Sequence, residues 1–184
     1  MRLDHTPQST AGGADLRAHA LDALLATLDS HPDVAVVGPR LVDANGSPEL
    51  SFGPMVSPLG QMQQKRRARG DVRALTSRTT HTDWVSGACL LVRRSEADAV
   101  GLLDERYFMY LEDVDFCAAI RARGQGVLFA AGVEVTHLRG RSWEGARGRM
   151  RAAYRESLVA FYRKHHPLLA PWLRLSLALM PRTS

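Results

Sequence analysis

Apolar residues near the start of the chain first recur at helical spacing and then form a short continuous run. Between residues 15 and 29, the apolar positions that repeat are Leu16, Ala20, Leu21, Leu24, Leu25 and Leu28. This spacing predicts an amphipathic helix over residues 15–29. Residues 34–39 are apolar up to a Gly-Pro pair, which is typical of a buried strand. A helix followed by such a strand indicates an α/β fold.

Runs and periodic repeats of apolar residues predict most of the later elements. Strands are expected over residues 84–92, 127–130 and 133–136, and helices over residues 95–103, 112–123 and 144–165. Gly124 is expected to end the second of these helices, and Ala131-Gly132 to form a turn between the last two strands.

Two stretches lack apolar periodicity. Residues 43–60 are rich in Gly, Pro and Ser, begin with an Asn45-Gly46 turn and are expected to form a loop. Residues 60–80 hold six Lys and Arg against one acid, Asp71, with almost no bulky apolar residues. We expect a mobile basic loop there, which is either simply solvated or in contact with phosphates.

Composition narrows the class of protein. The chain has 184 residues, of which 45% are hydrophobic and 23% charged, and its formal net charge is +5. These values are typical of one soluble globular domain and exclude a disordered tail, a collagen-like fibre and a disulfide scaffold. The basic balance favours anionic partners. Cys89 and Cys117 have apolar neighbours and are expected to be buried free thiols, which fits a cytoplasmic location, as does an N-terminus without an apolar leader.

The last residues, 168–184, are expected to form an amphipathic or apolar tail. Residues 168–180 are too few to span a membrane, and Pro171 and Arg174 interrupt them. Two interpretations stay equal: the tail lies on a bilayer surface, or it packs on the domain as a helix.

Residues 104–117 carry the densest candidate chemistry. An aromatic approach leads to Glu112, Asp113 and Asp115, three acids in the first turn of a predicted helix. Acids are stabilised at a helix N-terminus by its exposed N–H groups and the helix dipole. Three acids together repel one another, and a carboxylate beside aromatic walls suits a general base. The residues alone favour neither interpretation, the stabilisation of the helix N-terminus or the general base, over the other.

His137 ends a predicted strand and precedes a basic loop that contains Gly140. A lone histidine is more often a structural residue than a metal ligand, although a strand end beside arginines also suits a residue facing a phosphate or a metal. His165 and His166 have no acidic or thiol residue at metal-ligand spacing in the sequence and are interpreted as surface residues. Motifs of common hydrolases and of P-loop proteins are absent from the sequence.

Three motifs resemble the C-terminal, acceptor-side half of family 2 glycosyltransferases of the rhamnosyltransferase-like group. They are DWVSGACLLVRR at residues 83–94, FMYLEDVD at residues 108–115 and VTH at residues 135–137. The resemblance covers residues 20–167. It implies a GT-A fold, a Rossmann-like α/β/α sandwich with a mixed sheet. It also implies inverting transfer of a sugar from a nucleotide-diphosphate sugar to an acceptor hydroxyl, in cell-envelope polysaccharide synthesis.

The resemblance also implies roles for single residues. Asp113 would be the general base, Glu112 would orient the acceptor, and His137 would be a ligand of a divalent metal, Mn or Mg. The remaining residues implied to bind substrate are Trp84, Gly87, Tyr110, Asp115 and Arg141.

The start of the chain departs from the family pattern. Family members carry a further N-terminal segment with nucleotide-binding strands and a DxD-type metal motif, whereas this chain has Asp4-His5-Thr6 near the expected place. We therefore expect residues 1–167 to be a partial GT-A domain lacking those strands. The other metal ligands would come from the missing half, in the same chain or in a separate donor-binding protein. The isolated chain would bind donor weakly or not at all and would be incomplete or inactive.

Two further expectations concern partners. The acceptor is expected to be a sugar or a lipid-linked sugar, which would place a cytoplasmic protein in peripheral contact with the inner face of the cell membrane. The alternative function is a non-catalytic basic module that binds nucleic acid or an anionic membrane surface through residues 65–78 and 139–155. These basic segments lack interleaved aromatic residues, so specific nucleic-acid recognition is not expected.

Overall fold

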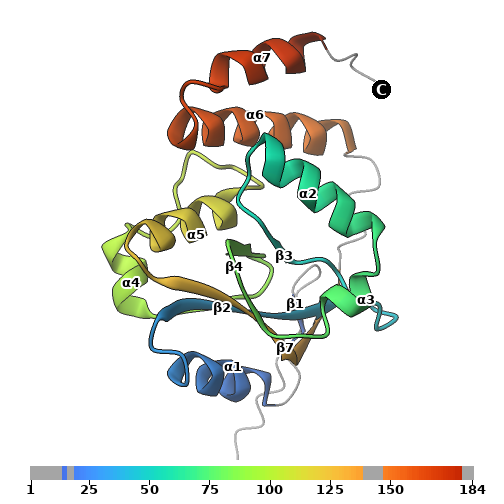
Figure 1. Cartoon of the computed structure of the whole chain (residues 1–184), viewed down its shortest axis with the longest axis vertical. Coiled ribbons are helices and arrows are strands. Elements are labelled where there is room, and N and C mark those ends of the chain that lie inside the picture. Colours follow the sequence, from blue (N-terminus) through green and yellow to red (C-terminus); the bar gives the residue numbers. More distant parts are fainter. Residues whose placement is uncertain (1–13, 16–18, 139–146, 180–184) are drawn as a thin grey trace, which may run out of the picture.

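The computed structural model describes residues 14–15, 19–138 and 147–179 (Figure 1). In chain order the elements are β1 (Ala14–Asp15), α1 (Ala20–Asp29), β2 (Val34–Val42), β3 (Phe52–Gly53), α2 (Pro58–Arg69), α3 (Val72–Leu75), β4 (Thr80–Thr82), β5 (Trp84–Val85), β6 (Leu91–Val92), α4 (Arg94–Ala99), α5 (Glu112–Ala122), β7 (Gly126–His137), α6 (Arg147–His165) and α7 (Ala170–Leu179). The expected helices and the strand at residues 34–39 are therefore present, with shifted ends.

A mixed sheet forms the centre of the fold. Its strand order is β1-β7-β2-β6, and β4 also pairs with β7. The long central strands β2 and β7 are parallel, whereas β1, β4 and β6 pair antiparallel with their neighbours. A second sheet consists of β3 and β5. The predicted α/β class with a mixed sheet is confirmed.

Helices cover both faces of the central sheet. On one face Leu24 and Leu28 of α1 pack with Val37 and Leu41 of β2. On the other face Phe116 and Ile120 of α5, with part of α4, form a second buried cluster against the sheet. Strand β2 contributes Val34, Val37 and Leu41 to the first cluster and Ala35 and Val36 to the second. Both of its faces are therefore buried, which explains its continuous apolar sequence. Figure 1 shows this layering, with α1 on one side and α4 and α5 on the other.

A third cluster joins the C-terminal helices to the rest of the fold. Leu158, Phe161 and Tyr162 of α6 pack against Tyr107 and Leu111, which precede α5. The first buried residue of α7, Ala170, belongs to the same cluster. The structure thus shows residues 170–179 as a helix packed on α6. Among the residues that the structure describes, no helix is long and apolar enough to cross a membrane.

The expected loop over residues 60–80 is wrong. This stretch contains most of α2, all of α3 and the start of β4. The Ser57 side chain caps α2 by accepting a hydrogen bond from the Gly60 N–H at 3.0 Å, Pro58 occupies the first turn, and arginines fill the last turn. Each of these features favours a helix at that end, although the segment has no apolar stripe.

Two strand predictions also need correction. Residues 126–137 form one strand, β7, instead of two strands with a turn. Its register against β2 jumps between Ala130 and Glu134, so the irregularity at Gly132 is a bulge and not a chain reversal. Residues 84–92, expected as one strand, are divided between β5 in the small sheet and β6 in the central sheet.

Candidate active site

The first turn of α5 is directed toward the carboxyl ends of the parallel strands. A turn over residues 123–125, with Gly124 at a φ of 85°, joins α5 directly to β7. The helix therefore runs back along the strand, and its first turn points toward the carboxyl end of β7. Ligands of open α/β sheets bind outside the carboxyl ends of the strands, the side toward which this first turn is directed.

Asp113, in the first turn of α5, is held by backbone N–H groups. Its Oδ2 accepts a hydrogen bond from the Gly87 N–H at 2.8 Å, and its Oδ1 accepts one from the Val114 N–H at 2.8 Å. A Cβ added at Gly87 would lie 3.2 Å from the Asp113 Cβ, so only glycine allows this approach comfortably. Burial raises the pKa of Asp113, and the N–H groups partly oppose that shift.

Glu112 precedes Asp113 and is partly buried. Its Oε2 is shielded from solvent and has no hydrogen-bond partner among the described residues. Burial raises the pKa of Glu112, and the charge of Asp113 raises it further. Two adjacent carboxyl groups with raised pKa values are typical of sites that exchange protons.

The backbone before these acids is strained. Tyr110 and Leu111 have φ values of 68° and 67°, a left-handed conformation that costs non-glycine residues about 1–2 kcal/mol each. Helix α6 holds this segment: the Ser157 hydroxyl donates to the Met109 carbonyl at 2.7 Å, and the ring of Tyr154 meets that of Tyr110 at 5.9 Å. Strain that the surroundings maintain is common at functional sites.

Asp115 faces the protein interior instead of a cleft. It is 2% exposed and accepts hydrogen bonds from Lys164 at 2.7 Å and from the Tyr107 hydroxyl at 3.1 Å, while His165 Nε2 lies 2.6 Å away. The expectation that Asp115 binds substrate is therefore not kept, because its carboxylate is enclosed by these three partners. It ties α5 to α6.

The ion pairs around Asp115 extend to Asp104. Lys164 also donates to Asp104 at 2.9 Å, and Arg106 pairs with the same carboxylate. Hydrogen bonds from Arg106 and Lys164 hold the pKa of Asp104 well below its usual range. Lys164 therefore holds Asp104, at the start of the segment that leads to Glu112, and Asp115, just after that segment.

Trp84 and His137 occupy different surroundings. The Trp84 indole N–H donates to the Pro54 carbonyl at 2.9 Å, and its partly buried ring packs between two apolar clusters. His137 ends β7, with Nδ1 3.3 Å from Glu49 Oε2. Arg141 lies outside the described residues.

The side chains around His137 provide only part of a metal site. A carboxylate on Nδ1 is the usual support of a metal-bound histidine and leaves Nε2 directed elsewhere. However, no group of three or more His, Cys, Asp and Glu that could hold a metal ion occurs within the described part of the chain. His137 and Glu49 therefore do not constitute a complete metal centre.

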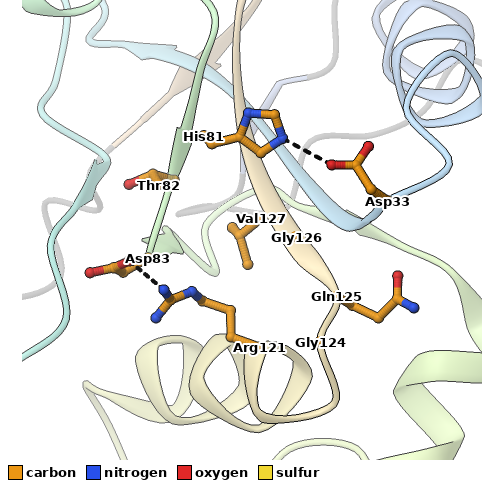
Figure 2. A pocket seen from close by; sticks show the side chains of 9 residues that line it. All are labelled: Asp33, His81, Thr82, Asp83, Arg121, Gly124, Gln125, Gly126 and Val127. Carbon is orange, nitrogen blue, oxygen red and sulfur yellow. Dashed lines mark ion pairs between the residues drawn. The ribbon is translucent and has the colours of Figure 1, made fainter.

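A separate hollow of about 440 Å³ lies at the opposite end of α5 (Figure 2). Two ion pairs line it: His81 with Asp33 at 3.4 Å, and Arg121 with Asp83 at 2.9 Å. It also contains Gly126, the first residue of β7. This hollow is at the amino end of the parallel strands, and its acids are already paired, so it suits the chemistry of a general base less well than the first turn of α5.

Several residues of the site were not found from the sequence. Tyr154, Ser157 and Lys164 are on α6, and Glu49 is in the loop after β2. The interpretation of His165 and His166 as surface residues is wrong, since His165 contacts Asp115 and His166 Nε2 lies 2.9 Å from the Val56 carbonyl. No local pattern marks these residues, because their partners are distant in the sequence.

Comparison with known proteins places most of the chain in one family. A family model described as "Glycosyltransferase like family 2" matches residues 16–155, which include the first turn of α5, Gly87 and His137.

Curated relatives have related names. The N-acetylglucosaminyl-diphospho-decaprenol L-rhamnosyltransferase of Mycobacterium tuberculosis is 32% identical over 157 residues, covering 80% of this chain and 51% of the relative. A low-salt glycan biosynthesis hexosyltransferase of Haloferax volcanii is 27% identical over 106 residues, covering 56% of this chain and 32% of the relative. A rhamnosyltransferase of Escherichia coli is 34% identical over 58 residues, covering 32% and 22% respectively. The chain spans about half the length of the mycobacterial relative.

Proposed function

The chain belongs to the glycosyltransferase-like family 2, and we propose that it serves the transfer of a hexosyl or rhamnosyl group from a nucleotide-diphosphate sugar to an acceptor hydroxyl. The observation that carries the proposal is the Glu112-Asp113 pair in the first turn of α5, where two backbone N–H groups fix the Asp113 carboxylate and burial raises the pKa of both acids. The names of two relatives mention glycan biosynthesis and a sugar linked to diphospho-decaprenol. We therefore propose a role in cell-envelope polysaccharide synthesis, with a sugar or lipid-linked sugar as acceptor.

Asp113 acts as the general base. Each of its oxygens accepts one backbone N–H, and a carboxylate oxygen has a further lone pair that is able to take the proton of the acceptor hydroxyl. The acceptor oxygen then bonds to the anomeric carbon as the bond from that carbon to the diphosphate breaks, which inverts the carbon. A raised pKa makes Asp113 a stronger base, and the two N–H groups fix the direction of its carboxylate.

The neighbouring residues position the acceptor. The carboxyl group of Glu112 is proposed to accept a hydrogen bond from a second hydroxyl of the sugar. The ring of Tyr110, supported by Tyr154, provides an aromatic surface beside it. Gly87, which has no side chain to cover Asp113, and Trp84, three residues before it, are proposed to contact the substrates.

We also propose a divalent metal, Mn or Mg, with His137 as one ligand. Glu49 orients the imidazole through Nδ1, and the remaining ligands come from outside the described residues. When bound, such a cation supplies positive charge that offsets the charge of the departing diphosphate.

A lipid-linked acceptor places the reaction at the inner face of the cell membrane, where a cytoplasmic protein makes peripheral contact. The alternative of a nucleic-acid module has less support. The basic α2 is partly engaged within the fold, since Arg67 lies over the Phe52 ring at 4.8 Å and Gln61 donates to the Tyr162 hydroxyl.

The proposal is tested by incubating the native protein, as its own cells make it, with nucleotide-diphosphate sugars and a lipid-diphosphate sugar acceptor. Mass spectrometry of the acceptor should show one added hexosyl or deoxyhexosyl group. In a Glu112→Gln variant, the KM for acceptor should rise by roughly tenfold, the effect of weakening a hydrogen bond to a charged group. Acceptor that stays unmodified with every donor, together with salt-sensitive binding to RNA or DNA, would favour the basic module instead.

A further inference from the structure

The positive charge of the protein is concentrated in α2, α6 and α7. Residues 58–78, from the start of α2 to the loop after α3, hold six Lys and Arg, four of them in α2, against one acid, and residues 149–179 of α6 and α7 hold six against one. The rest of the chain holds twelve Lys and Arg against seventeen Asp and Glu. Figure 1 shows these helices together at one end of the molecule, with α1 at the other. The protein therefore has a basic end, which attracts anionic surfaces.

Helix α7, at this basic end, is apolar on two faces. Ala170, Leu173 and Leu177 are at least partly buried toward the interior, and the first two pack with the cluster that contains α6. Trp172, Leu175 and Leu179 follow one another at helical spacing on another face and are 72%, 53% and 75% exposed. We call these three residues the exposed stripe. A helix that needed only to pack on α6 would have polar residues at these positions.

A basic groove runs between α6 and α7. It has a volume of about 410 Å³, and Arg155 and Arg163 of α6 and Arg174 of α7 line it together with one acid, Glu156. Guanidinium groups pair with phosphate oxygens through two parallel hydrogen bonds. Arg174 neighbours Leu175 in the sequence, so charge for phosphates and apolar surface for acyl chains occur on the same helix.

We propose that α7 seats the protein on an anionic lipid bilayer. The exposed stripe enters the boundary between headgroups and acyl chains, and the arginines of the basic groove contact lipid phosphates. Short surface helices that carry Trp and Leu beside Arg bind at this boundary. The inference deepens the proposed function, because a lipid-linked acceptor would be presented at this surface.

The position of α6 connects this surface to the candidate site. Tyr154 and Ser157 of α6 contact Tyr110 and Met109, just before the proposed base. Arg155 and Arg163 of the same helix line the groove against α7. One helix therefore separates the bilayer from the segment that leads to Glu112 and Asp113.

Vesicle flotation of the native protein tests the proposal without any sugar substrate. The protein should float with phosphatidylcholine vesicles that contain phosphatidylglycerol, and binding should fall as salt rises. It should remain unbound with phosphatidylcholine alone. Brominated acyl chains should quench the fluorescence of Trp172, so a Trp172→Phe variant should still bind while losing the quenching.

Two variants with matched controls locate the surface. Trp172→Ser with Leu175→Ser should weaken partitioning by at least about tenfold. Leu21→Ser with Leu25→Ser, which changes two exposed leucines of α1, should leave it unchanged.

Removing charge from the groove gives an independent check. Arg155→Gln with Arg174→Gln should weaken partitioning by about tenfold or more. Arg94→Gln with Arg123→Gln, which removes two arginines paired with acids elsewhere, should have little effect.

Three results would overturn the inference: no binding to anionic vesicles, equal losses in the control variants, or a dimer that the stripe variant dissociates while no vesicles bind. The last result would place a second copy of the chain on the stripe. Transfer to a soluble acceptor, if retained without vesicle binding, would overturn this inference alone. Vesicle binding without transfer would overturn only the proposed function.

Discussion

Replacing Asp113 by asparagine separates its chemical role from its structural one. The two side chains have nearly the same shape, but asparagine cannot accept the proton of a hydroxyl. General-base catalysis contributes about 10²–10⁴-fold, so the barrier should rise by about 3–5 kcal/mol. The structural cost is smaller. Asparagine keeps only one of the two oxygens that accept hydrogen bonds from the Gly87 and Val114 N–H groups. The loss of the other hydrogen bond lowers the stability by about 1 kcal/mol.

That loss is offset because the variant no longer buries a charge. Burial raises the pKa of Asp113, so the folded state holds the proton of this carboxyl more tightly than the unfolded state does. The stabilising contribution of this group is therefore fully present below the unfolded pKa, which is about 3.9. It is lost as the pH rises through the higher folded value. At neutral pH the Asp113→Asn variant should have nearly the Tm of the unchanged protein.

The assay is steady-state sugar transfer by the native protein and the variant, with a thermal unfolding curve for each. We expect kcat to fall by about 10²–10⁴-fold while KM changes little. In the unchanged protein, the rate should fall at low pH with a pKa above that of an ordinary aspartate. Asp98→Asn, at an exposed ion pair of α4, is the control and should alter neither quantity. A variant of Asp113 that keeps kcat within about tenfold would refute the general-base role.

Three other predictions concern the support of the site. Asp115→Asn should lower the free energy of unfolding by about 2 kcal/mol in urea denaturation, because Lys164 loses a buried charged partner while keeping some solvent contact; an unchanged value would contradict the network. Gly87→Ala should leave Tm similar but lower kcat by roughly tenfold, since its Cβ would crowd Asp113; full activity would show that Asp113 tolerates displacement. Leu102→Gly should raise the free energy of unfolding by about 0.5–1 kcal/mol, because exposed Leu102 has a φ of 64°; a loss of stability would contradict the strain at this position.

The elements predicted well from the sequence are those that local signals determine. Helix α5 has an apolar face, acids in its first turn and Gly124 just after its end. Strand β2 has a continuous apolar sequence because helices cover both faces of the sheet. Helix α2 has no comparable stripe. Its stability depends on the Ser57 cap and on contacts such as the hydrogen bond from Gln64 to the Phe52 carbonyl, which composition does not reveal.

The candidate site was only partly predictable for the same reason. Glu112 and Asp113 stand out as neighbouring acids after an aromatic segment, and the family resemblance gave them roles. Asp115 belongs to the same motif, yet its side chain bonds Lys164 and lies against His165, 49 and 50 residues further along the chain. Only the packing of α6 against α5 shows that this third acid supports the fold.

The most direct test of the central claim is a mass balance of the transfer reaction in the native protein. A nucleotide-diphosphate sugar and a lipid-linked acceptor are supplied, and both the released nucleoside diphosphate and the glycosylated acceptor are quantified. We expect equal amounts of the two products, with both formed far more slowly in the Asp113→Asn variant. Nucleoside diphosphate released without glycosylated acceptor, or transfer that does not depend on Asp113, would contradict it.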